Sequence, residues 1–261
     1  MIPMKFTVPF SDNEKLRQVV KVIQDNGRLN GLWTVANVNA VDRLGINDHG
    51  PVHSKIVANS ALRIFRLINR SGVDSSVKSA YQMSDEDAEV IIILAAVLHD
   101  LGHAVHREHH EEFGIGIAES LIKELLEGIY KGVNLGIMEG EILHACYAHE
   151  TEMDTLTLEA GTVKVADALD MEQGRARIPF KEGELTIHSV SATAIEEVTI
   201  RKGRSKPVQI VIEMSNSAGI FQLDNLFKPK LEHSGIRKYI EVTVEVGEEE
   251  AEKKIIEDYQ F

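Results

Sequence analysis

The stretch SDEDAEVIIILAAVLHDLGH, residues 84–103, predicts the centre of the fold. It begins with a serine and three carboxylates, which favour the positive end of a helix. The residues from Val90 to Leu98 are all apolar, so we expect this helix in the middle of a domain. The run is far shorter than the roughly 20 residues of a membrane-spanning helix, and no membrane insertion is expected. Two polar residues, His99 and Asp100, directly follow this apolar run at the end of the helix.

Helical periodicity continues on both sides of this stretch, with apolar residues at offsets of three, four and seven. The first predicted helix begins with a capping box at Ser11–Glu14 and stops at Gly27. The second begins near Pro51, which is tolerated in a first turn, and ends at Ser71 and Gly72. Further helices are predicted over residues 108–131, 139–149 and 158–171.

After about residue 179 the apolar period changes to two, which is typical of strands with one buried face. Strands are predicted over residues 184–190, 195–201, 208–214 and 240–246, with a helix over residues 223–231. The expected fold class is mainly α. A helical bundle over residues 1–180 is followed by a small α+β domain over residues 181–261, in the order β-β-β-α-β with an acidic tail.

The composition limits the classes of function. With 43% apolar residues, the 261 residues supply a substantial core without covalent cross-links. The sole cysteine, Cys146, forms no intrachain disulfide, which together with the lack of a secretory leader predicts a cytoplasmic protein. The net charge of −13 disfavours binding to nucleic-acid backbones, which requires a local excess of Lys and Arg. A small phosphorylated substrate, bound at a metal ion, remains compatible with this charge.

Four polar residues fall in apolar stretches that we expect inside the bundle: His53, His99, Asp100 and Asp167. Such groups cost free energy unless they are hydrogen-bonded or bound to a metal. A single buried histidine is most often a satisfied core residue, but four such residues together indicate a shared divalent cation. Imidazole and carboxylate ligands suit Mn, Fe, Zn, Ni or Mg with open positions for water.

The same residues resemble a known family. His53 within HGPVH, the LHDLGH of residues 98–103 and the VADALD of residues 165–170 are similar to the HD superfamily of metal-dependent phosphohydrolases, with its order H…HD…D. The resemblance covers roughly residues 45–180. It implies an all-helical fold in which His53, His99, Asp100 and Asp167 bind one ion, with Asp100 able to bridge to a second.

Two further histidines match the additional ligands of binuclear members. They are His110, in HEEFGIGIA, and His149, in YAHE. The sequence departs from the HD-GYP branch, because no GYP follows His149 and His103 replaces the lysine that often follows the HD pair. His103 is expected either to touch a phosphate oxygen or donate a proton, or to make a supporting hydrogen bond.

The resemblance leads to a functional hypothesis with alternatives. A hydroxide formed at one or two divalent ions would hydrolyse a small phosphoester or nucleotide, with Asp100 and His103 as catalytic residues. Arg175 and Arg177 are predicted to bind phosphate, although exposed arginines are often only solvated. The alternatives are a binuclear iron oxygenase on the same scaffold and a non-catalytic nucleotide sensor. The small sheet offers an edge through which a homo-oligomer could form.

Overall fold

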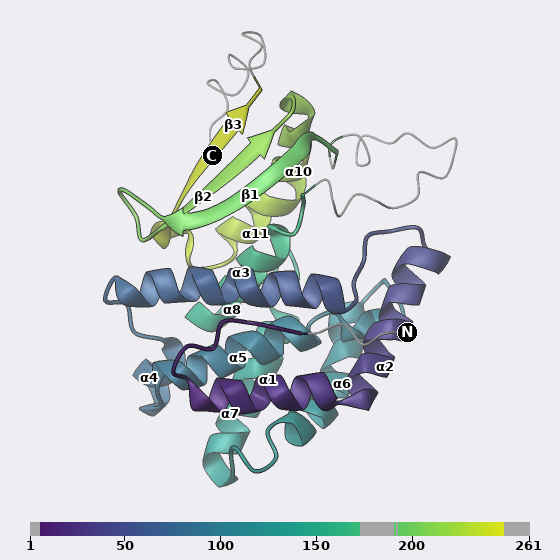
Figure 1. Cartoon of the computed structure of the whole chain (residues 1–261), viewed down its shortest axis with the longest axis vertical. Coiled ribbons are helices and arrows are strands. Elements are labelled where there is room, and N and C mark those ends of the chain that lie inside the picture. The colour runs from purple at the N-terminus through teal and green to yellow at the C-terminus, as the bar shows by residue number, and fades with distance from the viewer. Residues whose placement is uncertain (1–5, 173–190, 192, 248–261) are drawn as a thin grey trace.

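The computed structural model describes residues 6–172, 191 and 193–247. A bundle of helices carries a small sheet with short helices at one end (Figure 1). The bundle contains α1 (Glu14–Asp25), α2 (Gly27–Asn37), α3 (Pro51–Arg70), α4 (Ser76–Tyr81), α5 (Asp85–Leu98), α6 (His110–Leu125), α7 (Gly132–Tyr147) and α8 (Leu158–Ala168). The sheet region contains β1 (Ile195–Lys202), β2 (Val208–Met214), α10 (Ile220–Gln222), α11 (Lys228–Glu232) and β3 (Ile240–Val246). The predicted fold class is confirmed, whereas the predicted strand at residues 184–190 and the boundary at residue 180 lie outside the described residues.

Helix α5 is the centre of the bundle. It packs against α1, α3, α7 and α8, and every side chain from Val90 to Leu98 is at most 1% exposed. The helix begins as predicted, because the side chains of Ser84 and Asp87 each accept a hydrogen bond from the other residue's backbone N–H. Its C-terminal end is therefore held by packing on all sides, which makes it a rigid support for the residues that follow.

The predicted cap and stop of the first helix are wrong. The cap is Asn13, whose Oδ1 accepts from the N–H of Leu16 at 2.9 Å, and Ser11 instead adopts a left-handed backbone conformation with φ 47°. The helix ends at Asp25, and Gly27 begins α2. Asparagine caps a helix as well as serine does, so the two residues compete within a short segment.

Two glycine-rich segments are more helical than their sequence predicts. Helix α2 was not predicted because its glycines and asparagines have low helix propensity, but its Trp33 is buried and donates from Nε1 to the carbonyl of Val97 at 3.1 Å. Helix α7 begins at Gly132, earlier than predicted. Helix α6, by contrast, is shorter than the predicted range of 108–131. It ends at Leu125, ahead of Gly128, whose φ is positive. Tertiary packing therefore overrides local propensity in α2 and α7.

The sheet has the order β1-β2-β3. Strands β1 and β2 form an antiparallel pair, and β3 runs parallel to β2. A parallel pair needs a crossover connection, which α10, a π-helical turn at Leu223–Phe227 and α11 supply. The strands predicted over residues 195–201, 208–214 and 240–246, and the helix between the last two, are confirmed.

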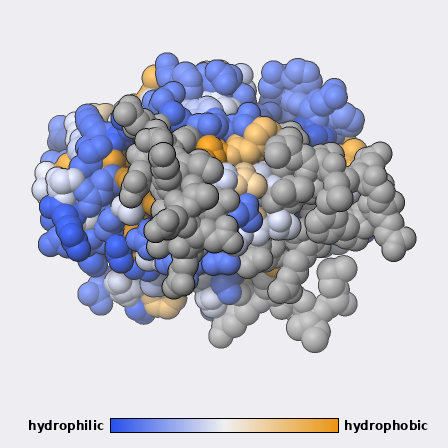
Figure 2. Space-filling model, turned by 90° about the horizontal axis from the view of Figure 1, so that it is seen from above, coloured by the Kyte–Doolittle hydropathy of each residue, from blue (hydrophilic) through white to orange (hydrophobic). Residues whose placement is uncertain are grey.

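The sheet region packs on the bundle through two helices. Helix α3 contacts β1 and β2, and α8 contacts α11 (Figure 1). The approach is closest at Gly161 of α8, where an added Cβ would lie 2.2 Å from the carbonyl oxygen of Ser234. Seen from the sheet end, the described surface is mostly hydrophilic (Figure 2). Within the described ranges, no helix is both long enough and apolar enough to cross a membrane.

Asp87 links α5 to its neighbours and gives the fold a testable pH dependence. Its carboxylate is buried and accepts hydrogen bonds from Lys15 Nζ at 2.6 Å and Tyr130 Oη at 2.5 Å. Burial alone would raise the pKa of Asp87, but these donors outweigh it and hold the pKa below its ordinary value. A carboxyl group with a depressed folded pKa stabilises the fold above its unfolded pKa of about 3.9, and that stabilisation is lost as the pH falls through the folded pKa.

Asp87→Asn is therefore expected to lower the free energy of unfolding by about 1–3 kcal/mol at neutral pH. The difference from the wild type should shrink as the pH falls below about 4. Urea unfolding in neutral and acidic buffers measures both effects. Glu86→Gln removes the same charge from an exposed side chain in the same helical turn and should change stability by less than about 0.5 kcal/mol. An Asp87 effect of the same size at every pH would contradict the assigned role.

Candidate metal centre

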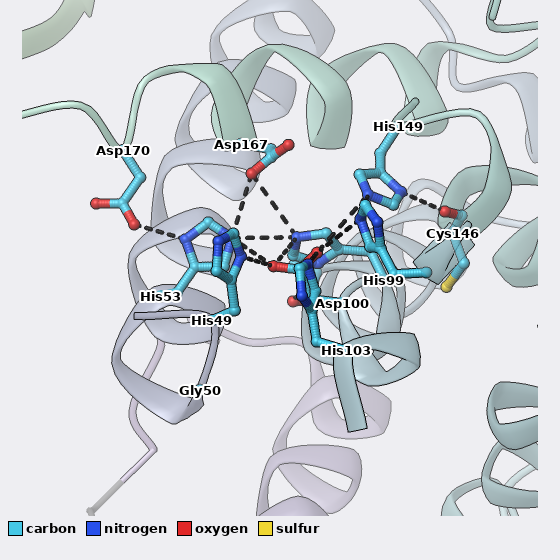
Figure 3. Close-up of polar contacts among 12 residues, drawn as sticks. His49, Gly50, His53, His99, Asp100, His103, Cys146, His149, Asp167 and Asp170 are labelled. Atoms are coloured by element: carbon cyan, nitrogen blue, oxygen red, sulfur yellow. Dashed lines mark hydrogen bonds and ion pairs between the residues drawn. The ribbon is translucent and has the colours of Figure 1, made fainter. Parts of the chain in front are cut away.

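The six residues predicted as metal ligands converge at the C-terminal end of α5. They are His53 in the first turn of α3, His99 and Asp100 after α5, His110 at the start of α6, His149 after α7 and Asp167 in α8. The side chain of Asp167 is 13% exposed, and the other five residues are buried. Figure 3 shows the carboxylate of Asp100 between His53 on one side and His149 on the other.

The turn after α5 directs His99 and Asp100 into the same region. The chain leaves α-helical geometry at Asp100 (φ −95°, ψ 3°) and continues as a 3-10 turn over Leu101–Ala104. Gly102 in this turn lies directly against α6, because an added Cβ would be 1.8 Å from the carbonyl oxygen of His110. The missing side chain of Gly102 therefore allows His110 to lie beside the His-Asp pair.

The first group of ligand atoms surrounds Oδ2 of Asp100. His53 Nε2 lies 3.2 Å from this oxygen and 3.2 Å from Asp167 Oδ1. His99 Nε2 lies 3.3 Å from the same Asp100 oxygen and 3.2 Å from His53 Nε2. We call the space among these four atoms position 1.

The second group surrounds the other oxygen of Asp100. His110 Nε2 lies 3.4 Å from Oδ1, and His149 Nε2 lies 3.8 Å from it. The two nitrogens are 3.3 Å apart, and we call the space that they share with Oδ1 position 2. A single carboxylate thus presents one oxygen to each position, which is the arrangement of a bridging ligand.

A hydrogen bond from Nδ1, the ring nitrogen that does not face position 1 or position 2, orients each of the four histidines His53, His99, His110 and His149. His53 Nδ1 lies 2.6 Å from Asp170 Oδ2, and the Nδ1 atoms of His99, His110 and His149 lie 3.1, 3.1 and 2.5 Å from the carbonyl oxygens of Ala96, Arg107 and Cys146. Carbonyl and carboxylate oxygens only accept hydrogen bonds, so each Nδ1 carries the hydrogen. In the neutral ring, each Nε2 then directs a lone pair into position 1 or position 2.

The donor set fits divalent cations. Two ligand atoms about 2.1 Å from one ion lie about 3.0–3.4 Å apart at octahedral or tetrahedral angles. The Nε2 pairs, 3.2 Å apart in position 1 and 3.3 Å apart in position 2, match this spacing. Facing lone pairs repel one another unless a proton or a cation lies between them. The nitrogen and oxygen ligands suit a borderline divalent ion such as Mn, Fe, Zn or Ni.

Charge compensation among these groups shifts their pKa values in opposite directions. Burial alone would lower the pKa of His99, but the carboxylates of Asp100 and Asp167 outweigh it and raise the pKa to about 9. Burial alone would raise the pKa of Asp100, but His99 and His49 hold it well below its ordinary value. Protons and metal ions therefore compete for the same Nε2 atoms, and metal binding should strengthen as the pH rises.

Two more histidines lie beside Asp100. His103 Nε2 lies 3.6 Å from Asp100 Oδ1 and accepts a hydrogen bond from Arg107 at 3.2 Å, whereas its buried Nδ1 has no hydrogen-bond partner among the described residues. His49 Nδ1 lies 2.7 Å from Asp100 Oδ2, and its ring stacks on that of His103 at 4.3 Å. His49 is the first residue of the HGPVH motif, and no role was predicted for it. Its offset of four from His53 was the available signal.

Lys230 of α11 was missed altogether. Its ammonium group forms an ion pair with Asp167 Oδ2 and helps to hold the pKa of that buried carboxyl well below its ordinary value, against the effect of burial. The sequence places Lys230 in a helix of the sheet region, with no motif to connect it to the bundle. Arg175 and Arg177, which were predicted to bind phosphate, lie outside the described residues.

A buried lysine fixes the turn that carries His149. Lys164 of α8 is fully buried, and its Nζ donates to the carbonyl oxygens of Glu150 and Met153, each at 2.5 Å. These two carbonyls follow His149 in the chain and lie beyond the end of α7, so the ammonium group pairs with backbone acceptors of the turn itself. The turn is thereby tied to the helix that carries Asp167.

Comparisons with known proteins agree with this geometry. The model of the HD domain family matches residues 52–172, a span that contains all six predicted ligands. An uncharacterized protein of Methanocaldococcus jannaschii, MJ1020, is 40% identical over 253 residues, which are 95% of this chain and 96% of that protein. Together with the clustered histidines and aspartates, these matches show that the chain belongs to the HD domain family.

Proposed function

We propose that this protein is a metal-dependent phosphohydrolase that acts on a small phosphoester or nucleotide. The observation that carries the proposal is that the two oxygens of Asp100 face different pairs of histidines. Its Oδ2 faces His53 and His99 at 3.2 and 3.3 Å, and its Oδ1 faces His110 and His149 at 3.4 and 3.8 Å. This arrangement supports two adjacent ions that share one carboxylate.

The six predicted ligands would bind the ions in two groups. His53, His99 and Asp167 would hold an ion in position 1, His110 and His149 would hold one in position 2, and Asp100 would contribute one oxygen to each position. Bound divalent ions supply positive charge that neutralises phosphate oxygens and lower the pKa of a coordinated water molecule. The Nδ1 tethers of the histidines fix the ring orientations, so little reorganisation accompanies the reaction.

His103 is suited to contact the phosphate group directly. Its Nε2 accepts from Arg107, so its Nδ1 carries a hydrogen that has no acceptor among the described residues. Burial lowers the pKa of His103, and the ring is neutral at physiological pH. These properties support a hydrogen bond from Nδ1 to a phosphate oxygen, and they favour that role over the donation of a proton from an imidazolium.

The charge of the chain supports a small substrate. A long nucleic acid would approach a molecule with a net charge of −13 against electrostatic repulsion. A small phosphoester or nucleotide carries few charges, and the ions neutralise them locally.

The test combines metal analysis with a substrate screen. Purified protein is stripped with a chelator, reloaded separately with Mn, Fe, Zn, Ni or Mg, and its metal content is measured. Each form is then assayed with nitrophenyl phosphate, bis-nitrophenyl phosphate and nucleoside mono-, di- and triphosphates. We expect one or two ions per chain and hydrolysis that disappears on stripping and returns on reloading. A loaded protein that releases no phosphate or alcohol from any of these esters would refute the proposal, and oxygen consumption by the iron form would instead favour an oxygenase.

A further inference from the structure

Lys230 reaches the metal centre from the sheet region, whereas all six predicted ligands come from the bundle. It lies 63 residues from Asp167 in the chain, and its ammonium group pairs with Oδ2 of that residue. The other oxygen, Oδ1, faces His53 and His99 in position 1. The side chain of Lys230 is only 13% exposed. A largely buried positive charge is therefore separated from position 1 only by the carboxylate of Asp167.

The backbone that carries Lys230 is fixed against the bundle. Thr155 donates from its N–H to the carbonyl of His233 at 3.0 Å and from Oγ1 to that of Ser234 at 2.6 Å. Ser234 is fully buried at the close approach to Gly161 of α8. These contacts follow Lys230 within a few residues, so the position of the ammonium group is set by packing.

An ammonium group in this place is suited to an additional anion. It has three N–H donors and no acceptor, and one carboxylate oxygen does not satisfy all three donors. With a cation in position 1, the charge of Asp167 is shared between that cation and Lys230. The lysine then retains positive charge for another partner, and charge-assisted hydrogen bonds to phosphate oxygens are stronger than neutral ones.

We propose that Lys230 binds an anionic phosphate oxygen of the substrate beside position 1. The sheet region thereby completes an active site whose metal ligands all belong to the bundle. This inference rests on the phosphohydrolase function proposed above and names a residue that recognises the phosphate group. The protein needs an intact α11 for substrate binding even though α11 supplies no metal ligand.

The experiment measures binding of inorganic phosphate to the Mn-loaded full chain by calorimetry. Lys230→Met keeps most of the unbranched side chain and removes its charge, and Lys230→Arg keeps the charge. Lys228→Met is the matched control, because Lys228 lies in the same helix and pairs with Asp224 at 3.9 Å. Metal content and thermal unfolding are measured for every variant. Lys230→Gln replaces the methionine variant if the latter does not fold.

We expect phosphate to bind about tenfold or more weakly to Lys230→Met, with unchanged metal content. Lys230→Arg should restore most of the affinity, and the control should bind as the wild type does. With an active substrate, KM should rise more than kcat falls. Equal phosphate affinity in Lys230→Met, or loss of metal from it, would overturn the inference, as would a wild type that binds no phosphate. If the wild type binds phosphate but hydrolyses no ester, the proposed function fails while the comparison of variants still decides the role of Lys230.

Discussion

Replacing Asp100 by asparagine is expected to reduce hydrolysis severely and to weaken metal binding in both positions. Each oxygen of Asp100 faces a different pair of imidazoles, at 3.2–3.8 Å. The amide keeps the shape of the carboxyl group but loses its charge, and its NH₂ group directs hydrogens toward one of the two positions. Bound ions contribute several kcal/mol to transition-state stabilisation, so the loss should reach about 10³-fold in kcat/KM.

The measurement pairs a hydrolysis assay with metal analysis of the same samples. Asp12→Asn is the control, because Asp12 is an exposed aspartate ahead of α1 and supplies no proposed ligand. It should retain wild-type activity and metal content. An Asp100→Asn protein that keeps two ions and wild-type turnover would remove the proposed bridging role.

Gly102→Ala is expected to destabilise the fold and to displace His110. The added methyl group would lie 1.8 Å from the carbonyl oxygen of His110 and 2.8 Å from the backbone nitrogen of Gly114. Both contacts are to backbone, so relief requires a shift of α6 or of the turn after α5. Overpacking of this kind should cost about 3 kcal/mol in the free energy of unfolding. Position 2 should lose metal before position 1, because His110 is the ligand that moves.

Gly116→Ala is the matched control for Gly102→Ala. Gly116 is an exposed residue inside α6, and an added Cβ there would meet no atom within 4 Å. Alanine in a helix interior is favoured over glycine by about 0.5–1 kcal/mol, so this variant should be stabilised. Denaturant unfolding of the two variants measures effects of opposite sign. A Gly102→Ala protein as stable as the wild type would contradict the close packing of α6 on the turn.

Much of the fold was predictable because hydrophobic patterns are local in the sequence. The apolar run from Val90 to Leu98 predicts a buried helix. The alternating apolar residues of β2 and β3 predict strands with one buried face. Polar residues within such apolar stretches, for example Asp100 and Asp167, are also visible in the local sequence. They therefore predicted the position of the candidate site. The family resemblance added His110 and His149, and the structure places their Nε2 atoms 3.3 Å apart.

The remaining features depend on contacts between distant segments. Lys230 meets Asp167 only after α11 packs on α8, and no periodicity predicts that contact. Helix α2 contains residues of low propensity, and its burial against α5 through Trp33 compensates for them. At the first helix, Ser11 and Asn13 are both good caps, and the structure uses Asn13.

The hydrogen bonds from Nδ1 of the four histidines have a consequence for metal selection. Protein oxygens orient each ring, so the ligand side chains are already ordered before an ion binds. One ion can therefore be exchanged for another without refolding. Nitrogen and oxygen ligands of this kind accept several first-row divalent metals, so availability takes a large part in deciding which of these metals is bound. The ion that this protein carries in a cell should therefore follow the local supply of manganese, iron and zinc.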